Sequence, residues 1–234
     1  MEADGRKETT IRRREAVALL IGIGSAVLAY FTAGPRAIAR ALAAEPGGSA
    51  AATCVLSRET TEGPYWVENR LTRRDITEGR KGAGLGLSIK VIDVPGCKPI
   101  KGADVELWHA DARGAYSGVS GASSRFLRGH QKTNAAGVVR FETLYPGWYP
   151  GRTPHIHVKV HVGGSEVHTG QIFFTDAASR SVYRTGVYSS RGQADTTNGS
   201  DSIYRQTGGS RATARVSRRR GGGYRGTVTL GVRA

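Results

Sequence analysis

The sequence predicts an all-β protein, an antiparallel β-sandwich with extended loops that build its functional site. Short stretches of the chain alternate apolar with polar residues, Gly-rich turns separate these stretches, and no long amphipathic helix pattern follows residue 45. Sandwiches are built from strands of this kind, packed as two layers around one core. The chain has 234 residues, which is enough for one such domain and a short leader.

The leader is predicted over residues 1–44, and the sandwich domain over residues 45–234. Arg12, Arg13 and Arg14 directly precede an apolar run from Ala16 to Ala33, and small residues follow. This arrangement is typical of a twin-arginine-type signal, so we expect export to the periplasm or beyond the cell. The run of 18 residues is near the lower limit for spanning a bilayer, which leaves a retained membrane anchor as the alternative. We expect no stable membrane span once the leader is removed.

Alternating residues predict the strands that follow. They are expected at residues 85–91, 105–107, 138–141, 155–162, 172–174 and 227–230. Arg218 to Gly223 are expected to form the turn of a hairpin between residues 212–217 and 224–232. Residues 186–209 are rich in Gly, Ser and Arg and are interpreted as an ordered excursion or a loop rather than a domain linker.

The stretch from His155 to Val162 carries the most informative pattern. Its even-numbered residues are apolar and its odd-numbered residues are polar, so a strand here would place His155 and His157 together on a polar face. Two imidazoles at positions i and i+2 can approach one metal ion. The plainer interpretation of His-x-His in a strand is surface polarity.

Two tyrosines make a metal site the stronger interpretation. Tyr149 lies six residues before His155, and Tyr116 follows the end of another predicted strand. Imidazole suits several transition metals, whereas a tyrosinate oxygen is a hard donor that favours a hard, highly charged ion. Two Tyr and two His ligands therefore favour ferric iron. Tyr145 is the rival of Tyr149, although the spacing to Arg152 and His155 favours Tyr149.

Several motifs together resemble those of the intradiol ring-cleavage dioxygenases. In chain order they are Glu62-Gly63-Pro64-Tyr65, the tract from Val105 to Asp111, Gly114-Ala115-Tyr116-Ser117, Thr133-Asn134-Ala135-Ala136-Gly137 and the tract from Tyr149 to His157. The resemblance runs from about Cys54 to the C-terminus. It is to the short, exported, single-domain branch rather than to the longer catechol dioxygenases with a helical dimerisation segment.

The resemblance implies a non-haem Fe(3+) enzyme that incorporates both atoms of O2. Its small-molecule substrate would be a catechol, cleaved between the two hydroxylated carbons to a cis,cis-muconate-type diacid. Tyr116 and His155 would be equatorial ligands, and Tyr149 and His157 axial ones. Tyr149 would leave the iron as substrate chelates and would take a catechol proton.

The resemblance also implies roles for residues that do not hold metal. Arg152 would stabilise negative charge on the bound substrate, and Gln171 would assist from beside the ligands. A two-residue turn at Gly163 and Gly164 would place Gln171 on the wrong face, so we expect a three-residue turn through Ser165 or a bulge at Gly170. The segment Gly63, Pro64 and Tyr65 is expected to form a wall of the substrate pocket.

Other candidate ligands are interpreted as structural. His109 and Asp111 are expected to support the fold, and His161 and His168 to be exposed near the far end of the hairpin. The two cysteines, Cys54 and Cys97, can pair in an oxidising compartment or remain unrelated buried thiols.

Charge does not change this interpretation. The net charge is +15, and residues 1–44 hold seven Lys/Arg and four Asp/Glu, which leaves +12 for the rest. The late arginines lack interleaved aromatics and a recognition helix, so we expect a solvated basic loop and no nucleic-acid partner. A basic surface can still steer anionic aromatic acids.

Two competing functions remain. A cupin-type metal site also uses His-x-His, but it needs a glutamate four or five residues later, where this chain has His161 and Val162. A non-catalytic iron- or aromatic-binding β-sandwich would keep the scaffold without turnover. The sequence leaves the oligomeric state and the identity of the catechol open.

Overall fold

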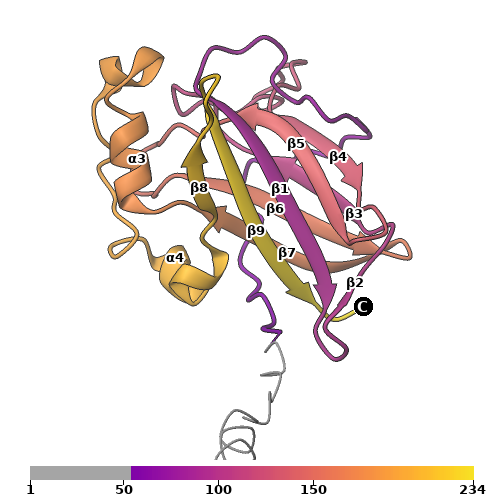
Figure 1. Ribbon diagram of the computed structural model, residues 1–234. Coiled ribbons are helices and arrows are strands. Elements are labelled where there is room, and N and C mark those ends of the chain that lie inside the picture. Colours follow the sequence, from indigo (N-terminus) through magenta and orange to yellow (C-terminus); the bar gives the residue numbers. More distant parts are fainter. Residues whose placement is uncertain (1–53) are drawn as a thin grey trace, which may run out of the picture. The chain divides into compact units, whose positions relative to one another are not determined.

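The computed structural model describes residues 54–234, which form a sandwich of two β-sheets, as predicted (Figure 1). The five-stranded sheet holds β1 (Gly84–Asp93), β2 (Lys98–Pro99), β5 (Val138–Leu144), β8 (Arg215–Arg218) and β9 (Tyr224–Val232). The four-stranded sheet holds β3 (Asp104–Trp108), β4 (Arg128–Lys132), β6 (His155–Val162) and β7 (Ser165–Phe173), in the order β4-β3-β6-β7. The predicted signal segment, residues 1–44, lies outside the described residues. Within the described part, no helix is both long and apolar enough to cross a membrane.

One strand pair departs from the antiparallel pattern. β1 and β9 run parallel along nearly the whole of β1, from Leu85 beside Tyr224 to Asp93 beside Val232. A parallel pair cannot be joined by a tight hairpin, and here nearly the whole domain connects the two strands. β5 pairs antiparallel with the other side of β1. β9 and β8 form the predicted late hairpin, although β8 begins three residues later than expected.

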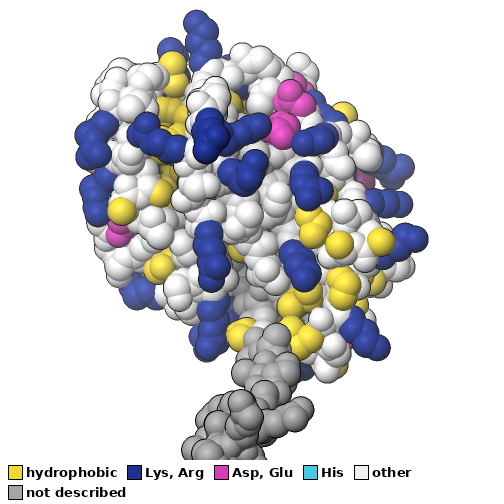
Figure 2. All heavy atoms as spheres, in the orientation of Figure 1, with side chains coloured by type: hydrophobic (Ala, Val, Ile, Leu, Met, Phe, Trp, Pro, Cys, Tyr) yellow, Lys and Arg dark blue, Asp and Glu magenta, His cyan; other side chains and the backbone are white. Residues whose placement is uncertain are grey.

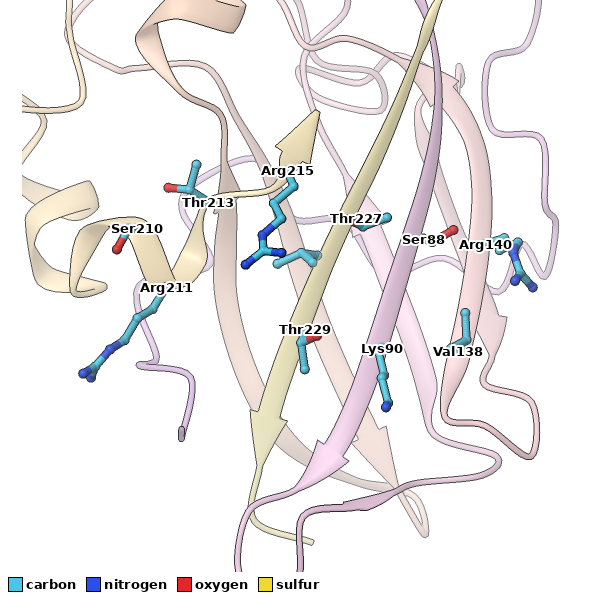
Figure 3. Close-up of a pocket in the computed structure, with 11 residues that line it drawn as sticks. Ser88, Lys90, Val138, Arg140, Ser210, Arg211, Thr213, Arg215, Thr227 and Thr229 are labelled. Atoms are coloured by element: carbon cyan, nitrogen blue, oxygen red, sulfur yellow. The ribbon is translucent and has the colours of Figure 1, made fainter. Parts of the chain in front are cut away.

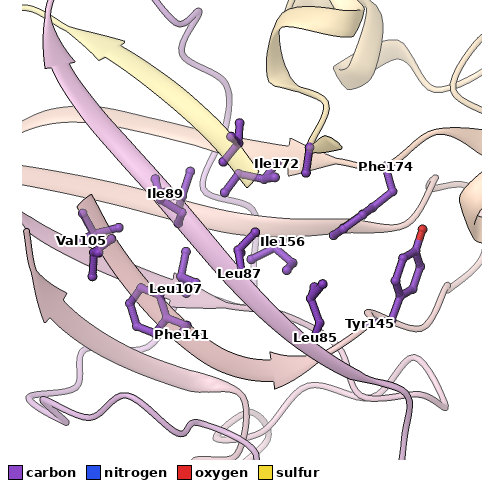
Figure 4. Close-up of a cluster of buried hydrophobic side chains, with 14 of the residues drawn as sticks. Leu85, Leu87, Ile89, Val105, Leu107, Phe141, Tyr145, Ile156, Ile172 and Phe174 are labelled. Atoms are coloured by element: carbon purple, nitrogen blue, oxygen red, sulfur yellow. The ribbon is translucent and has the colours of Figure 1, made fainter. Parts of the chain in front are cut away.

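The hydrophobic core lies between the two sheets (Figure 4). Leu85, Leu87 and Ile89 point inward from β1, at every second position, and all are at most 1% exposed. Val105 and Leu107 meet them from β3 in the opposite sheet. Because successive side chains of a strand point to opposite faces, the alternation seen in the sequence becomes one buried and one outward face. Each such side chain contributes roughly 1.5–3 kcal/mol on burial.

Both faces of β6 are buried, including the polar face that carries the two histidines. Ile156 and Val158 join the core, and His155 and His157 on the other face are only 2% and 1% exposed. The segment before β1 covers that outer face, with the backbone N–H of Thr60 bonded to the carbonyl of Thr169 at 3.0 Å. The histidines therefore lie in a layer between the sheet and its covering loops.

A bulge in the β6–β7 hairpin sets the register of Gln171. Val160 pairs with His168, and His161 pairs with Glu166, so Val167 is the extra residue on β7. The turn uses Gly163 and Gly164, and the bulge places Gln171 directly across from His157. The predicted need for a compensating irregularity was right, but its position at Gly170, or in a longer turn, was wrong.

The same register corrects the expectation for His168. It is 3% exposed, because it lies across from the core residue Val160 and the segment 58–60 passes beside β7. Burial lowers its pKa below the usual value. His161, at the position after the bulge, is half-exposed.

Residues 175–213 form an ordered excursion between β7 and β8. It contains α3 (Asp176–Val182), the 3-10 turn Gly186–Arg191, α4 (Ser202–Gln206) and a second 3-10 turn, Gly209–Ala212. Asp201 caps α4 by accepting hydrogen bonds from the N–H groups of Ile203 and Tyr204. This excursion brings Asp201 next to the start of β6. The short strand β4 was not predicted, because Arg128 to Lys132 show no apolar alternation.

Cys54 and Cys97 are joined by a disulfide, with Cα atoms 5.5 Å apart. The bond ties the beginning of the described chain to the turn between β1 and β2. Closing a loop of 43 residues stabilises the folded state by about 4 kcal/mol in the chain-entropy model.

Candidate metal centre

Four side-chain donors converge at the start of β6. The hydroxyl of Tyr149 lies 3.1 Å from Nε2 of His155, and this nitrogen lies 3.2 Å from Nε2 of His157. The hydroxyl of Tyr116 lies 3.1 Å from Nε2 of His157. The structure thus brings together all four ligands that the sequence predicts.

Two loops and one strand position these donors. His155 and His157 come from β6, Tyr149 from the loop after β5, and Tyr116 from the loop after β3. The two tyrosine loops touch through glycine: a Cβ at Gly114 would overlap the backbone oxygen of Trp148, the neighbour of Tyr149. Gly114 also has a φ of +82°, which L side chains rarely adopt. A glycine is therefore needed where the two loops meet.

Burial keeps both histidines neutral, and a backbone partner fixes the tautomer of His155, whereas Nδ1 of His157 is buried without a partner among the described residues. Burial lowers the pKa of His155 to about 3, and it lowers that of His157 well below its usual value. The carbonyl of Thr153 lies 2.7 Å from Nδ1 of His155, and a carbonyl can only accept. Nδ1 therefore carries the hydrogen, and Nε2 is left as a ligand atom.

The tyrosines stay protonated unless a cation is present. Burial raises the pKa of Tyr116 well above its usual value, and the neighbouring hydroxyl of Tyr149 raises it further. Burial also raises the pKa of Tyr149, although the charge of Arg152 partly opposes this. A metal ion that binds a phenolate reverses this preference, because its own charge dominates the local electrostatics.

These residues fit a metal ion. Ligands about 2 Å from a first-row metal ion, at roughly right angles, are about 3 Å apart, which matches the spacing of the donors. Nε2 of His155 and Nε2 of His157 face each other, and two neutral imidazoles can place at most one hydrogen between these two nitrogens. Within residues 54–234 no group of three or more His, Cys, Asp or Glu forms a metal site, which leaves no cupin-type set. The donor set is two phenols and two imidazoles.

A hydrogen-bonded chain lies beside the donors. Arg152 donates from Nε to Asp201 at 2.9 Å and from Nη2 to Oε1 of Gln171 at 2.6 Å. Gln171 in turn donates to the carbonyl of Thr61 at 3.1 Å. Asp201 is 2% exposed, so its charge fixes the guanidinium firmly. The structure places the two predicted non-ligand residues in contact with each other and next to His157.

Two of the three residues that were predicted to form a wall of the pocket lie against the donor side chains. Tyr65 stacks on Tyr116, with ring centroids 4.4 Å apart, and meets Tyr149 edge-on at 6.1 Å. A Cβ at Gly63 would sit 3.2 Å from Cε1 of His157. Pro64, between them, is exposed. The segment lies over the donors, as a pocket wall would.

Three residues near the donors were not predicted as functional. Trp108 stacks on His157, Asp201 holds Arg152, and Arg128 is buried beside Tyr116. The tract around Trp108 was interpreted as structural, and nothing in the local sequence marks Asp201 or Arg128. A buried capping Asp could have been suspected only from the helix start that follows it.

Arg128 is 1% exposed and forms no ion pair with any described carboxylate. Its Nη2 donates to the carbonyls of Ser117 at 2.6 Å and Tyr65 at 2.7 Å, whereas Nη1 has no partner among the described residues. Burial lowers its pKa to about 10. It therefore ties the Tyr116 loop to the segment that carries Tyr65.

The residues that were expected not to bind metal make structural contacts instead. Tyr145 is in the core, with its hydroxyl 2.8 Å from Ser179. His109 bonds Thr143 at 2.7 Å, and burial lowers its pKa to about 4. Asp111 accepts from the N–H groups of Arg113 and Ala115 and forms an ion pair with Arg80. These contacts hold the turn that leads to Tyr116.

Comparison with known proteins agrees with this geometry. Residues 61–180, just over half of the chain, match the sequence profile of the family described as Dioxygenase (Dioxygenase_C). An intradiol ring-cleavage dioxygenase from Tetranychus urticae is 36% identical, with a TM-score of 0.73 over 77% of this chain and 95% of that one.

Other proteins match over less of the chain or at lower sequence identity. Catechol 1,2-dioxygenase 1 of Acinetobacter lwoffii is 39% identical over 98 residues, and the match spans 38% of this chain but only 31% of that protein. Hydroxyquinol 1,2-dioxygenase from Pseudomonas putida shares the fold, with a TM-score of 0.60 at 16% identity over 76% of this chain and 67% of that one. The family profile and the Tetranychus urticae structure, taken with the site, show that the chain belongs to the intradiol ring-cleavage dioxygenases.

Proposed function

We propose that this protein is a non-haem Fe(III) dioxygenase that cleaves a catechol between its two hydroxylated carbons. The single observation that carries the proposal is the convergence of two phenols and two neutral imidazoles, whose donor atoms follow one another at 3.1 to 3.2 Å in the order Tyr149, His155, His157 and Tyr116. Membership of the family supports it. The product would be a cis,cis-muconate-type diacid, whose two new carboxyl oxygens come from one O2.

Tyr116, Tyr149, His155 and His157 would hold the iron. A ferric ion would act as a Lewis acid toward a catechol bound as a dianion. The two imidazoles need no deprotonation to bind, because burial already keeps them neutral. The phenols must lose their protons, so iron binding should release protons to solvent.

Tyr149 is suited to act as a base when the substrate binds. Tyr149 and Tyr116 are half-exposed, whereas His155 and His157 are buried, so a tyrosine can swing away more readily than a histidine, and the resemblance to the family assigns this role to Tyr149. Burial raises the pKa of its phenol, and a phenolate set free in this environment has a strong tendency to regain a proton. The hydroxyl of a catechol is the proton source at hand.

Arg152 would stabilise the negative charge that develops on the ring. Its guanidinium is held on one side by Asp201 and on the other by Gln171, so it needs little reorganisation during the reaction. A protein that only stored iron would have no use for a cation fixed beside its ligands. This chain of contacts favours catalysis over the non-catalytic alternative.

An oxygen-uptake assay tests the proposal. The purified, iron-loaded protein is mixed with catechol, protocatechuate and hydroxyquinol, and the products are analysed by mass and absorbance. We expect uptake of one O2 per ring with at least one of them, and a product opened between the hydroxylated carbons. Cleavage beside the hydroxylated carbons would contradict the proposed reaction.

Two tyrosine variants provide the matched comparison. Tyr149→Phe removes a proposed ligand and should lower turnover and visible absorbance, whereas Tyr145→Phe removes only a core hydroxyl. Tyr145→Phe should therefore keep both the colour and the activity. If the protein binds iron and catechol but consumes no oxygen, it is the non-catalytic binding protein.

A further inference from the structure

The outer face of the five-stranded sheet carries a second feature, remote from the metal centre. Two depressions of about 600 and 390 Å³ lie on it, and they share Ser88 and Arg140. We call the combined feature the basic trough. Its cationic side chains are Arg74, Lys90, Arg140, Arg211, Arg215, Arg219 and Arg225. Figure 2 shows Lys and Arg side chains spread over this face, with few acidic ones among them.

The strand register arranges the trough in rows. Arg140, Ser88, Thr227 and Arg215 are successive partners across β5, β1, β9 and β8, so two arginines flank two hydroxyls (Figure 3). Neighbouring strands are about 4.8 Å apart, and the row therefore spans about 14 Å between its outer Cα atoms. The next row places Lys90 beside Thr229. The 3-10 turn Gly209–Ala212 adds Arg211 at one side.

Most of these cations lack a partner. Glu142 is the one acidic residue that lines the trough, and it pairs with Arg74 at 3.1 Å and Arg219 at 3.5 Å. The remaining cations form no ion pair or hydrogen bond through their side chains with other described residues; they are Lys90, Arg140, Arg211, Arg215 and Arg225. Some cations elsewhere in the domain are paired, such as Lys159 with Glu62 and Glu166, whereas others, such as Lys101 and Lys132, are exposed and unpaired but do not line the trough. Like charges gathered without counter-charges repel each other and attract a polyanion.

We propose that the basic trough binds an acidic polysaccharide, a carbohydrate chain that bears carboxylate or sulfate groups. The guanidinium fork matches the geometry of both groups. Ser88, Thr227 and Thr229 lie between the cations and can exchange hydrogen bonds with sugar hydroxyls. The two adjoining depressions make an elongated site, which suits a chain better than a single small anion.

The lining argues against other polyanions. Its only aromatic residue is Phe141, whose side chain is buried in the core, so no ring is available for the base stacking that binds single-stranded nucleic acid. The large exposed hydrophobic residues of the described chain are Val55, Leu56 and Val187, and none lines the trough. An amphipathic anchor for a lipid surface is therefore missing from this face.

The proposal is independent of the reaction. The trough lies on the five-stranded sheet, whereas the metal donors extend from the outer side of the four-stranded sheet and its loops. The site would hold the enzyme on an acidic carbohydrate matrix while the metal centre remains open to small aromatic molecules. Loss of carbohydrate binding should then leave oxygen uptake unchanged.

Two triple variants test the trough. Lys90→Ser, Arg140→Ser and Arg215→Ser together remove three of its unpaired cations. The matched control, Lys101→Ser, Lys132→Ser and Arg184→Ser, removes the same charge from exposed positions outside the trough. Each protein is titrated at 0.1 M salt with polygalacturonate and dextran sulfate, and with neutral dextran of equal length.

We expect the unaltered protein to bind one or both acidic polymers but not neutral dextran. The trough variant should bind at least tenfold more weakly, and the control should stay within about threefold. Polygalacturonate and dextran sulfate separate carboxylate from sulfate recognition. Equal losses in the two variants, or no binding to either acidic polymer, would overturn the proposal.

Duplex DNA and phosphatidylserine vesicles complete the experiment. Tighter binding to either one, abolished in the trough variant, would assign the trough to that partner and refute the carbohydrate proposal. Circular dichroism and catechol turnover verify that both variants are folded. A trough variant with unchanged turnover and weakened polymer binding would support two separate sites.

Discussion

The indole ring of Trp108 lies parallel to the imidazole ring of His157, with centroids 4.9 Å apart and planes 9° apart. Trp108 is the last residue of β3 and pairs with His157 of β6 in the sheet, so the stack follows from the register. The indole is wholly buried and blocks one side of the imidazole. The orientation of this proposed ligand therefore depends on packing as well as on its own strand.

Replacing Trp108 should loosen His157. We expect Trp108→Leu to lower iron affinity about tenfold, the lower end of what supporting residues around a metal typically contribute. Phe141→Leu removes a comparable ring from the core away from the donors and should lower thermal stability without changing iron affinity. Iron titration and thermal unfolding of the two variants separate these effects. Equal iron affinities would show that the stack has no orienting role.

Iron should give the protein a visible colour through charge transfer from tyrosinate to Fe(III). We expect one ferric ion per chain, lost on treatment with a strong chelator and regained with added iron. His157→Ala should lose the metal, because it removes one of four converging donors. Metal analysis and visible absorbance measure this. A protein that stays colourless after reconstitution would rule out the proposed ligand set.

Arg152 should matter for turnover and not for metal content. Arg152→Ala should reduce turnover about a hundredfold or more, which is typical for the loss of one preorganised charge partner in a dry site. Asp201→Asn should have a smaller effect in the same direction, because it weakens the ion pair that holds the guanidinium. Full activity of Arg152→Ala on every catechol tested would show that this arginine does not stabilise charge on the substrate.

Acid should destabilise the fold through His109. Burial lowers the pKa of this imidazole to about 4, whereas an unfolded histidine has a pKa near 6.5. Between these values the unfolded state binds more protons, so the free energy of unfolding falls as pH falls from about 6.5 to about 4, by about 3 kcal/mol in total. We expect His109→Gln to reduce this dependence, while the buried His155 and His157 keep a remaining part of it. Urea unfolding of both proteins at several pH values measures how steeply the free energy of unfolding changes with pH, and the two slopes should differ between pH 4 and 6.5 and become equal above pH 7. Equal slopes over the lower range would contradict the prediction.

Export by the twin-arginine route remains a prediction for residues 1–44. Replacing Arg12, Arg13 and Arg14 with lysine should leave precursor in the cytoplasm, and mature protein should begin near Ala44 when export succeeds. Cell fractionation and N-terminal sequencing measure both. Unchanged export of the lysine variant would point to another route.

Local patterns in the sequence predicted most of the strands, with β2 and β4 excepted, and the candidate donor residues. The alternation from His155 to Val162 depends only on the two-residue period of a strand, so it could be recognised without knowing what packs on either face. The same holds for the core positions of β1. Tyr116, Tyr149 and the two histidines stood out because residue chemistry and motif spacing are both local properties.

Tertiary structure decided what surrounds those donors. Asp201 reaches Arg152 from 49 positions away, and Arg128 reaches Tyr65 from 63 positions away. The register of Gln171 depends on one bulged residue, Val167, because a shift of one residue reverses the face of every side chain that follows. Contacts of this kind arise only when distant segments pack together, and a single sequence carries no local pattern that records them.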